Sequence, residues 1–236
     1  MNTKDNTPRY LGAAYLVVVL TSLASGVATD SAMGSGAIAD ILAKVAGNAS
    51  LLHFANLAGL INAVGILILA ALLYVVLNGQ GQVMAMAATL CWVGEAFFYT
   101  LNQIESNALV HVASDFQGSG GVSGPNALLY QLEGRFLVSD FHQSGGTILM
   151  FFYCAGGLLF YYLFFKSRFV PRWISLYGLI AVSIGIVGAS IELLGHPLGM
   201  VPYIAIGPFE IIIGLYLLTR SVKIGSKTPD VELVTR

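Results

Sequence analysis

Three carboxylates lie within long apolar stretches of the sequence, where a charged side chain is costly. The first, Glu95, is followed by Tyr99 and Asn102 at helical spacing, so the three side chains share one helix face. A charge at the centre of a bilayer costs about 2.5 to 3.5 kcal/mol on insertion scales. This stripe therefore predicts either a proton carrier, general acid or base, or ligand contact, or a neutral Glu95 that is hydrogen-bonded to a neighbouring helix.

The other two acids lie in the last two apolar stretches. Glu192 precedes His196 by four residues, a spacing at which a helix brings two side chains together to share a proton or hold a metal. The alternative is a capping pair at a helix end. Glu210 follows Pro208, which cannot donate to the carbonyl of Ile204 and so loosens that turn. There the alternatives are a functional acid and a neutral acid buried at a packed kink.

Histidines suggest a possible metal site. His53, His142 and His196 fall near corresponding ends of three apolar stretches, and with Glu95 and Glu192 they could line one cavity. Three histidines and a carboxylate suit zinc or another transition metal. No closely spaced ligand motif such as HExxH accompanies them, and a histidine near a membrane surface is more often an interfacial residue. The histidines are candidate ligands only, and the sequence identifies no cofactor.

Two polar residues begin the fourth apolar stretch, but they cannot easily serve one site. Asp140 and His142 are separated by about 200° around a helix, so they face nearly opposite ways. Asp140 and Gln143 match the capping box that begins a helix. His142 alone is therefore the candidate for chemistry at this point.

The composition indicates an integral membrane protein, whose helices must position these residues. The 236 residues are 56% hydrophobic and 10% charged, whereas soluble domains carry about 25% charged residues. Six mostly apolar stretches are long enough to cross a hydrocarbon core about 30 Å thick. They cover about residues 10–28, 51–77, 82–103, 141–165, 173–195 and 201–219. We expect an all-α, polytopic bundle that forms a single domain over residues 1–236. The net charge of −1 argues against a nucleic-acid partner.

The basic residues orient these spans. With the N-terminus inside, the inner segments hold nine of the 11 Lys and Arg residues, and the outer segments hold only Lys44 and Arg135. We therefore expect a multi-pass protein of the cell (inner) membrane with both termini in the cytoplasm. Residues 104–139 then form a long outer loop, in which 125–136 are predicted to be an amphipathic helix that packs on the bundle or in the lipid headgroups. Residues 37–46 predict a second short outer helix.

Three stretches resemble one bacterial family, DUF4386. They are "RYLGAAYLV" (9–17), "FFKSRFVPRWISLYGLIA" (164–181) and "GPFEIIIGLYLLTRS" (207–221). The resemblance covers most of the chain in hydropathy and order. It implies a six-span membrane fold and, since the family is uncharacterised, no activity. It also makes Pro171, Arg172, Pro208 and Glu210 the positions that carry the family pattern.

Three functions stay open. The first is binding of a lipid or other apolar small molecule, or service as an accessory subunit, because the sequence is 11% aromatic and has no GxSxG or Walker A motif. The second is a small proton-coupled transporter that uses Glu95, Glu192 and Glu210, in which a homo-oligomer would supply the missing symmetry. The third is an outward-facing membrane enzyme, or a metal or haem protein, that uses the histidines and acids. Expected partners are membrane lipids, a second copy of the chain or a membrane subunit.

Overall fold

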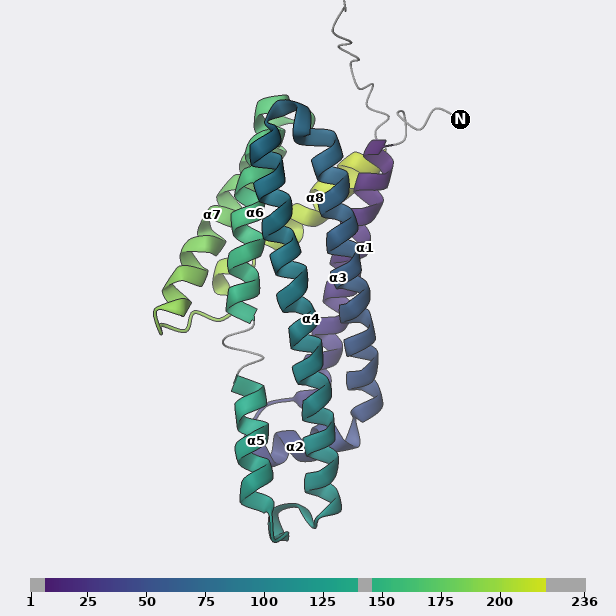
Figure 1. The fold of residues 1–236 in the computed structure, drawn as a ribbon, viewed down its shortest axis with the longest axis vertical. Helices are drawn as coiled ribbons and strands as arrows, with labels where there is room; N and C mark the ends of the chain where they lie inside the picture. The colour runs from purple at the N-terminus through teal and green to yellow at the C-terminus, as the bar shows by residue number, and fades with distance from the viewer. Residues whose placement is uncertain (1–6, 140–145, 220–236) are drawn as a thin grey trace, which may run out of the picture.

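A computed structural model describes residues 7–139 and 146–219, and over these ranges the chain is helical and contains no strand (Figure 1). The long helices are α1 (Thr7–Met33), α3 (Ala49–Leu77), α4 (Gln82–Gly118), α6 (Gly146–Ser167), α7 (Arg172–Leu193) and α8 (Ile206–Thr219). Shorter elements are α2 (Ile38–Gly47), α5 (Ala127–Ser139) and the 3₁₀ turns η2 (Asn78–Gln80), η3 (Gly121–Ser123) and η5 (Val201–Tyr203). Within the described ranges, six segments are long and apolar enough to cross a membrane, the last being η5 with α8. The all-α, six-span prediction is confirmed.

The six spanning segments form a ring in the order α1, α3, α4, α6, α7 and α8, since each helix contacts the next and α8 contacts α1. We call the end at which α1 begins and α8 ends the terminal end, and the opposite end the distal end (Figure 1). The α3–α4 and α6–α7 turns also lie at the terminal end, where the Lys166 ammonium donates to the Gln80 carbonyl at 2.9 Å. Successive spanning helices therefore run in alternating directions through the bundle.

At the distal end, α1, α3 and α4 extend further than α6, α7 and α8 (Figure 1). The 37 residues of α4 extend for about 55 Å, whereas the 22 residues of α6 extend for about 33 Å. Residues 104–118, expected in an outer loop, continue α4 as one helix, because Leu109, Val110 and Phe116 are buried at helical spacing against α2 and the distal ends of α1 and α3. Figure 1 shows α2 and α5 beside this extension.

The predicted amphipathic outer helix exists as α5, but its apolar face does not pack on the bundle. Leu128, Leu132 and Phe136 are exposed, whereas Ala127 and Gly134 are buried. Tyr130, Leu137 and Val138 are partly buried against the distal core. Gly134 is needed there, since a Cβ atom would lie 2.9 Å from a methyl group of Leu42 on α2. The helix therefore packs on α4 and α2 by its other face, and contact of its exposed apolar face with the lipid headgroups stays a prediction.

A polar belt separates two hydrophobic cores. One core fills the ring near the terminal end and the other joins the distal ends of α1, α3 and α4 to α2. Between them α1, α3 and α4 bury polar side chains, namely Ser25, Asn56, Asn102, Gln103 and Ser106. Many leucine, isoleucine and valine side chains on the outside of the ring are exposed, as a lipid-facing surface requires. The belt therefore places hydrogen-bonding groups between the two cores, inside the bundle.

Candidate functional site

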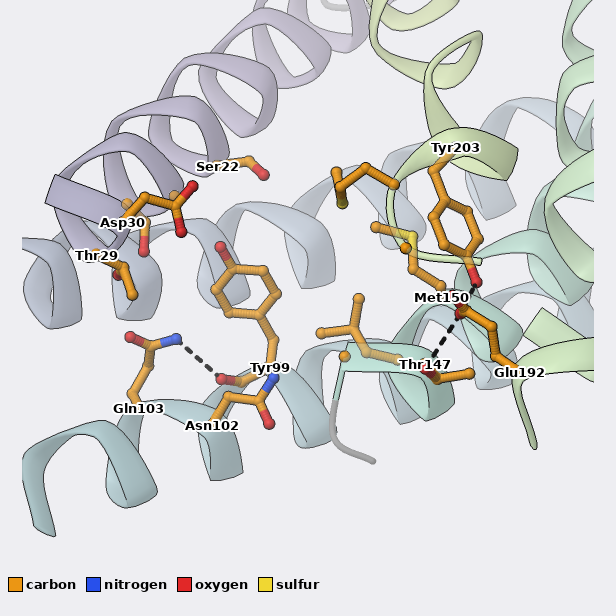
Figure 2. A pocket seen from close by; sticks show the side chains of 16 residues that line it. Ser22, Thr29, Asp30, Tyr99, Asn102, Gln103, Thr147, Met150, Glu192 and Tyr203 are labelled. Carbon is orange, nitrogen blue, oxygen red and sulfur yellow. Dashed lines mark hydrogen bonds between the residues drawn. The ribbon is translucent and has the colours of Figure 1, made fainter. Parts of the chain in front are cut away.

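A cavity of about 500 Å³ opens beside the polar belt, between α1, α4, α6, α7 and η5. Figure 2 shows two polar walls that face each other across it. Small residues leave this space, since Gly26, Gly146 and Gly199 all line it. Polar side chains from α1, α4, α6 and α7 line the cavity, which makes it the candidate functional site.

One wall consists of hydroxyl, amide and carboxyl groups from α1 and α4. Ser22, Thr29 and Asp30 recur at helical spacing on α1, which places them on the face that lines the cavity. On α4, Tyr99 extends from the helix toward α1 (Figure 2), and its backbone carbonyl accepts a hydrogen bond from the side-chain amide of Gln103 at 3.2 Å. This wall offers both donors and acceptors to a bound molecule.

The opposite wall is organised around Glu192 of α7. Its Oε2 atom accepts hydrogen bonds from the Tyr203 hydroxyl at 2.8 Å and from the Thr147 hydroxyl at 3.2 Å (Figure 2). Its Oε1 atom accepts one from the backbone N–H of Leu198 at 3.2 Å. Three donors from α6, η5 and the preceding loop therefore fix this carboxylate at the edge of the cavity, since charge-assisted hydrogen bonds are stronger than neutral ones.

Among the described residues, the two charged side chains that line the cavity are both acidic. Asp30 and Glu192 face it from opposite walls, and no Lys, Arg or His lines it among the residues that the structure describes. Leu149, Met150 and Met200 supply apolar surface between the two walls. The cavity therefore combines negative charge, hydrogen-bonding groups and an apolar part, which is the chemistry that holds an amphipathic molecule.

A second polar group lies in the terminal-side core. We call Tyr15, Glu95, Tyr153, Tyr161 and Glu210 the carboxyl–phenol cluster. The Tyr153 hydroxyl donates to Oε1 of Glu210 at 2.8 Å and lies 3.1 Å from the Tyr161 hydroxyl. Glu95 is 6% exposed, and its Oε2 atom has no hydrogen-bond partner in the described structure. The two carboxyls come from α4 and α8, which are distant in sequence.

Trp92 of α4 ties this cluster to α6. Its indole N–H donates to the backbone carbonyl of Tyr153 at 3.1 Å, and its ring stacks on the Tyr153 ring with centroids 5.8 Å apart. Gly156 permits this approach, because a Cβ atom there would lie 3.0 Å from the Ala88 carbonyl oxygen and against the Trp92 ring. The helices that carry Glu95 and Tyr153 are therefore held in close contact.

The residues expected to do chemistry divide between these two places. Tyr99, Asn102 and Glu192 line the cavity, whereas Glu95 and Glu210 belong to the carboxyl–phenol cluster. The predicted stripe of Glu95, Tyr99 and Asn102 therefore spans both sites along α4.

His53 and His196 do not gather with them. His53 on α3 and His196 after α7 are exposed, and neither lines the cavity. Among the residues that the structure describes, no group of three His, Cys, Asp or Glu side chains could hold a metal ion. His142, Asp140 and the capping box predicted for Asp140 lie in 140–145, outside the described residues. The structure thus brings His53, His196 and Glu192 to no common site.

Sequence reasoning missed several residues of the cavity. Asp30, Thr147 and Tyr203 contribute polar atoms to it, yet none was a candidate. The regular spacing of Ser22, Ser25, Thr29 and Asp30 in the first span was a signal that could have found the α1 wall. Thr147 continues the polar spacing of Gln143 and Ser144 in the sequence, whereas Tyr203 is a single polar residue whose partner, Glu192, comes from another helix.

Comparisons with known proteins give one result about the family. A family model described as a domain of unknown function (DUF4386) matches residues 10–221. No curated protein and no solved structure matches the chain.

Proposed function

We propose that this chain, which belongs to the DUF4386 family of domains of unknown function, binds a small amphipathic molecule with a positively charged end. The observation that carries this proposal is the cavity with two facing carboxylates, Asp30 and Glu192, and an apolar part between them. The molecule is either a membrane lipid or a free amphiphilic amine, since both present the same chemistry.

The size of the cavity supports a small ligand. Cavities that bind small molecules measure roughly 300 to 1,000 Å³, and this cavity measures about 500 Å³. That volume accommodates a head group and part of an apolar tail. The tail would lie against Leu149, Met150 and Met200, and the rest of a longer chain would follow the apolar outside of the bundle.

The surroundings of the cavity favour a cation over an anion. An anionic head would face Asp30 and Glu192 with no basic side chain among the described lining residues. An ammonium group would instead be attracted to both carboxylates. Tyr99 and Tyr203 add aromatic rings on opposite walls, and such rings attract ammonium groups with about 0.5 to 2 kcal/mol.

We also propose that the terminal end faces the cytoplasm and that the distal end faces outward from the cell membrane. Arg9, Lys166, Arg168 and Arg172 lie in the first turn of α1 and around the α6–α7 turn, at the terminal end. Lys44 and Arg135 lie on α2 and α5 at the distal end. This bias follows the positive-inside rule, so the ligand would enter the cavity from the outer side.

The charge of the ligand can be tested with matched amphiphiles. We expect purified protein to retain a long-chain alkyltrimethylammonium in native mass spectrometry and to release a fatty acid of the same chain length. Asp30→Asn should weaken retention of the cationic probe at least tenfold, which corresponds to about 1.4 kcal/mol. Glu192→Gln should act in the same direction.

The matched control is Glu133→Gln, which removes an exposed acid from α5 outside the cavity and should leave retention unchanged. Equal retention of both probes by the unmodified protein would contradict the proposal. The mass of the molecule that copurifies from native membranes then separates a lipid from a free amine.

A proton-coupled carrier is the second candidate function. The observation that favours it is a pair of acids within the spanning region, the buried Glu95 and the partly buried Glu210, which are close enough to interact electrostatically. Intramembrane carboxyls recur in proton-driven transporters. An uptake assay in which Glu210→Gln leaves transport unchanged would remove this candidate.

A further inference from the structure

The carboxyl–phenol cluster lies outside the ligand cavity and has its own chemistry. We propose that this cluster is a reversible proton-binding site in which Glu210 takes up and releases the proton. The inference goes beyond ligand binding, because it assigns a second site to a different part of the bundle and needs no occupant of the cavity.

Among the described residues, no cation compensates the charge of Glu210. The titratable groups close enough to Glu210 to interact with it electrostatically are Tyr15 on α1, Glu95 on α4, and Tyr153, Cys154 and Tyr161 on α6. From α7, Tyr177 packs edge-on against the neighbouring Phe209 ring at 5.8 Å. None of these groups is a Lys, Arg or His. Glu210 is partly buried among these groups, and a carboxylate in apolar surroundings without a counter-charge favours binding a proton.

The cluster contains two acids, Glu95 and Glu210. Glu95 and Glu210 belong to the same core, since Trp92, three residues before Glu95, stacks on the Tyr153 ring, whose hydroxyl donates to Glu210, and two carboxylates that share such a site oppose each other's ionisation. We therefore expect at least one of the two carboxyl groups to carry a proton. Oε2 of Glu95 has no hydrogen-bond partner in the described structure, so Glu95 has an oxygen free to carry it.

A chain of hydrogen bonds runs from Tyr161 through Tyr153 and ends on Glu210. Tyr153 donates its only proton to Oε1 of Glu210, so the Tyr161 hydroxyl is left to donate to the oxygen of Tyr153. When Glu210 binds a proton, the carboxylic acid can donate to Tyr153 and both hydrogen bonds can reverse. No heavy atom has to move, so the same structure accommodates both protonation states.

A path for the proton lies along α4. Tyr99 lines the ligand cavity and follows Glu95 by four residues, about one helical turn or 5.4 Å along the axis. The cavity, which is partly open to its surroundings, therefore ends about one turn from the cluster. We expect protons to exchange between the cluster and the distal side by this route.

Tryptophan fluorescence tests the proposal directly. The chain has two tryptophans, Trp92, which stacks on Tyr153, and the exposed Trp173. In a Trp173→Phe protein reconstituted in lipid nanodiscs, Trp92 is the only reporter. We expect its emission to change with pH in a single transition, and the transition to stay in place when sodium is replaced by potassium or choline at constant pH.

Three variants in this background identify the group. Glu210→Gln should abolish the transition, whereas the control Glu133→Gln, on exposed α5, should retain it. Tyr153→Phe should shift the midpoint, because it removes the hydroxyl that donates to Oε1 of Glu210. Infrared difference spectra between the two ends of the transition should show a carboxylate converted to a carboxylic acid.

Several results would overturn the proposal. They are no transition in the Trp173→Phe protein, a transition that survives in folded Glu210→Gln, or a transition that follows sodium at constant pH. If Glu210→Gln does not fold, the infrared spectrum of the Trp173→Phe protein decides. A transition without a new carboxylic acid band then rules out the site.

Discussion

Gly26→Phe is expected to weaken retention of the bound amphiphile at least tenfold, or about 1.4 kcal/mol, without unfolding the protein. Gly26 lines the cavity from α1, and a Cβ atom built there meets no atom within 4 Å. A phenyl ring therefore enters open space and takes the place of the ligand. Native mass spectrometry with the alkyltrimethylammonium probe measures the loss.

The matched control is Gly207→Phe on α8. Gly207 also has nothing within 4 Å of a built Cβ atom, but it does not line the cavity. The same change of residue type in another spanning segment should leave retention of the probe as in the unmodified protein. If Gly26→Phe and Gly207→Phe retained the probe equally well, the cavity could not be the binding site.

Gly12→Ala is expected to destabilise the bundle by about 1 to 3 kcal/mol, the usual cost of adding a methyl group to a tightly packed contact. A Cβ atom at this position of α1 would lie 2.7 Å from the carbonyl oxygen of Gly214 and 2.9 Å from the carbonyl carbon of Leu217. Both are backbone atoms of α8 and cannot rotate away. The two helices must then separate, which opens the ring between its first and last spans.

Gly26→Ala on the same helix is the control for this prediction, because its new methyl group meets no neighbour. It should unfold at the same temperature as the unmodified protein or at a slightly higher one, since Ala favours a helix over Gly by about 1 kcal/mol. Thermal unfolding in mild detergent compares the two variants. Equal midpoints for Gly12→Ala and Gly26→Ala would contradict the close α1–α8 contact.

The spanning helices could be predicted from the sequence because lipid imposes its requirement on each segment separately. Each span must be long and apolar whatever its neighbours are. The distal extension of α4 could not be found in this way. Asn102, Gln103 and Glu105 lower the hydropathy at the point where the membrane span was expected to end, but the helical spacing of buried residues continues to Phe116.

The sites were predictable only in part, for a related reason. Acids within apolar stretches are unusual in any one segment, so Glu95, Glu192 and Glu210 could be identified from their own surroundings. Their hydrogen-bonding partners could not be identified from the sequence. Tyr153 and Tyr203 become important because α6 and η5 bring them to Glu210 and Glu192, and that proximity depends on helix packing. The histidines showed the reverse case, since His53 and His196 lie near corresponding ends of two spans but on exposed surfaces.

The central claim is that the cavity between the two carboxylate walls holds one amphipathic cation. The most direct measurement is native mass spectrometry of the unmodified protein released from native membranes without added ligand, beside Gly26→Phe prepared in the same way. We predict one additional molecule per chain of unmodified protein, with a positively charged group in its fragment spectrum, and its absence from Gly26→Phe. An anionic molecule, or the same molecule on both proteins, would contradict the account.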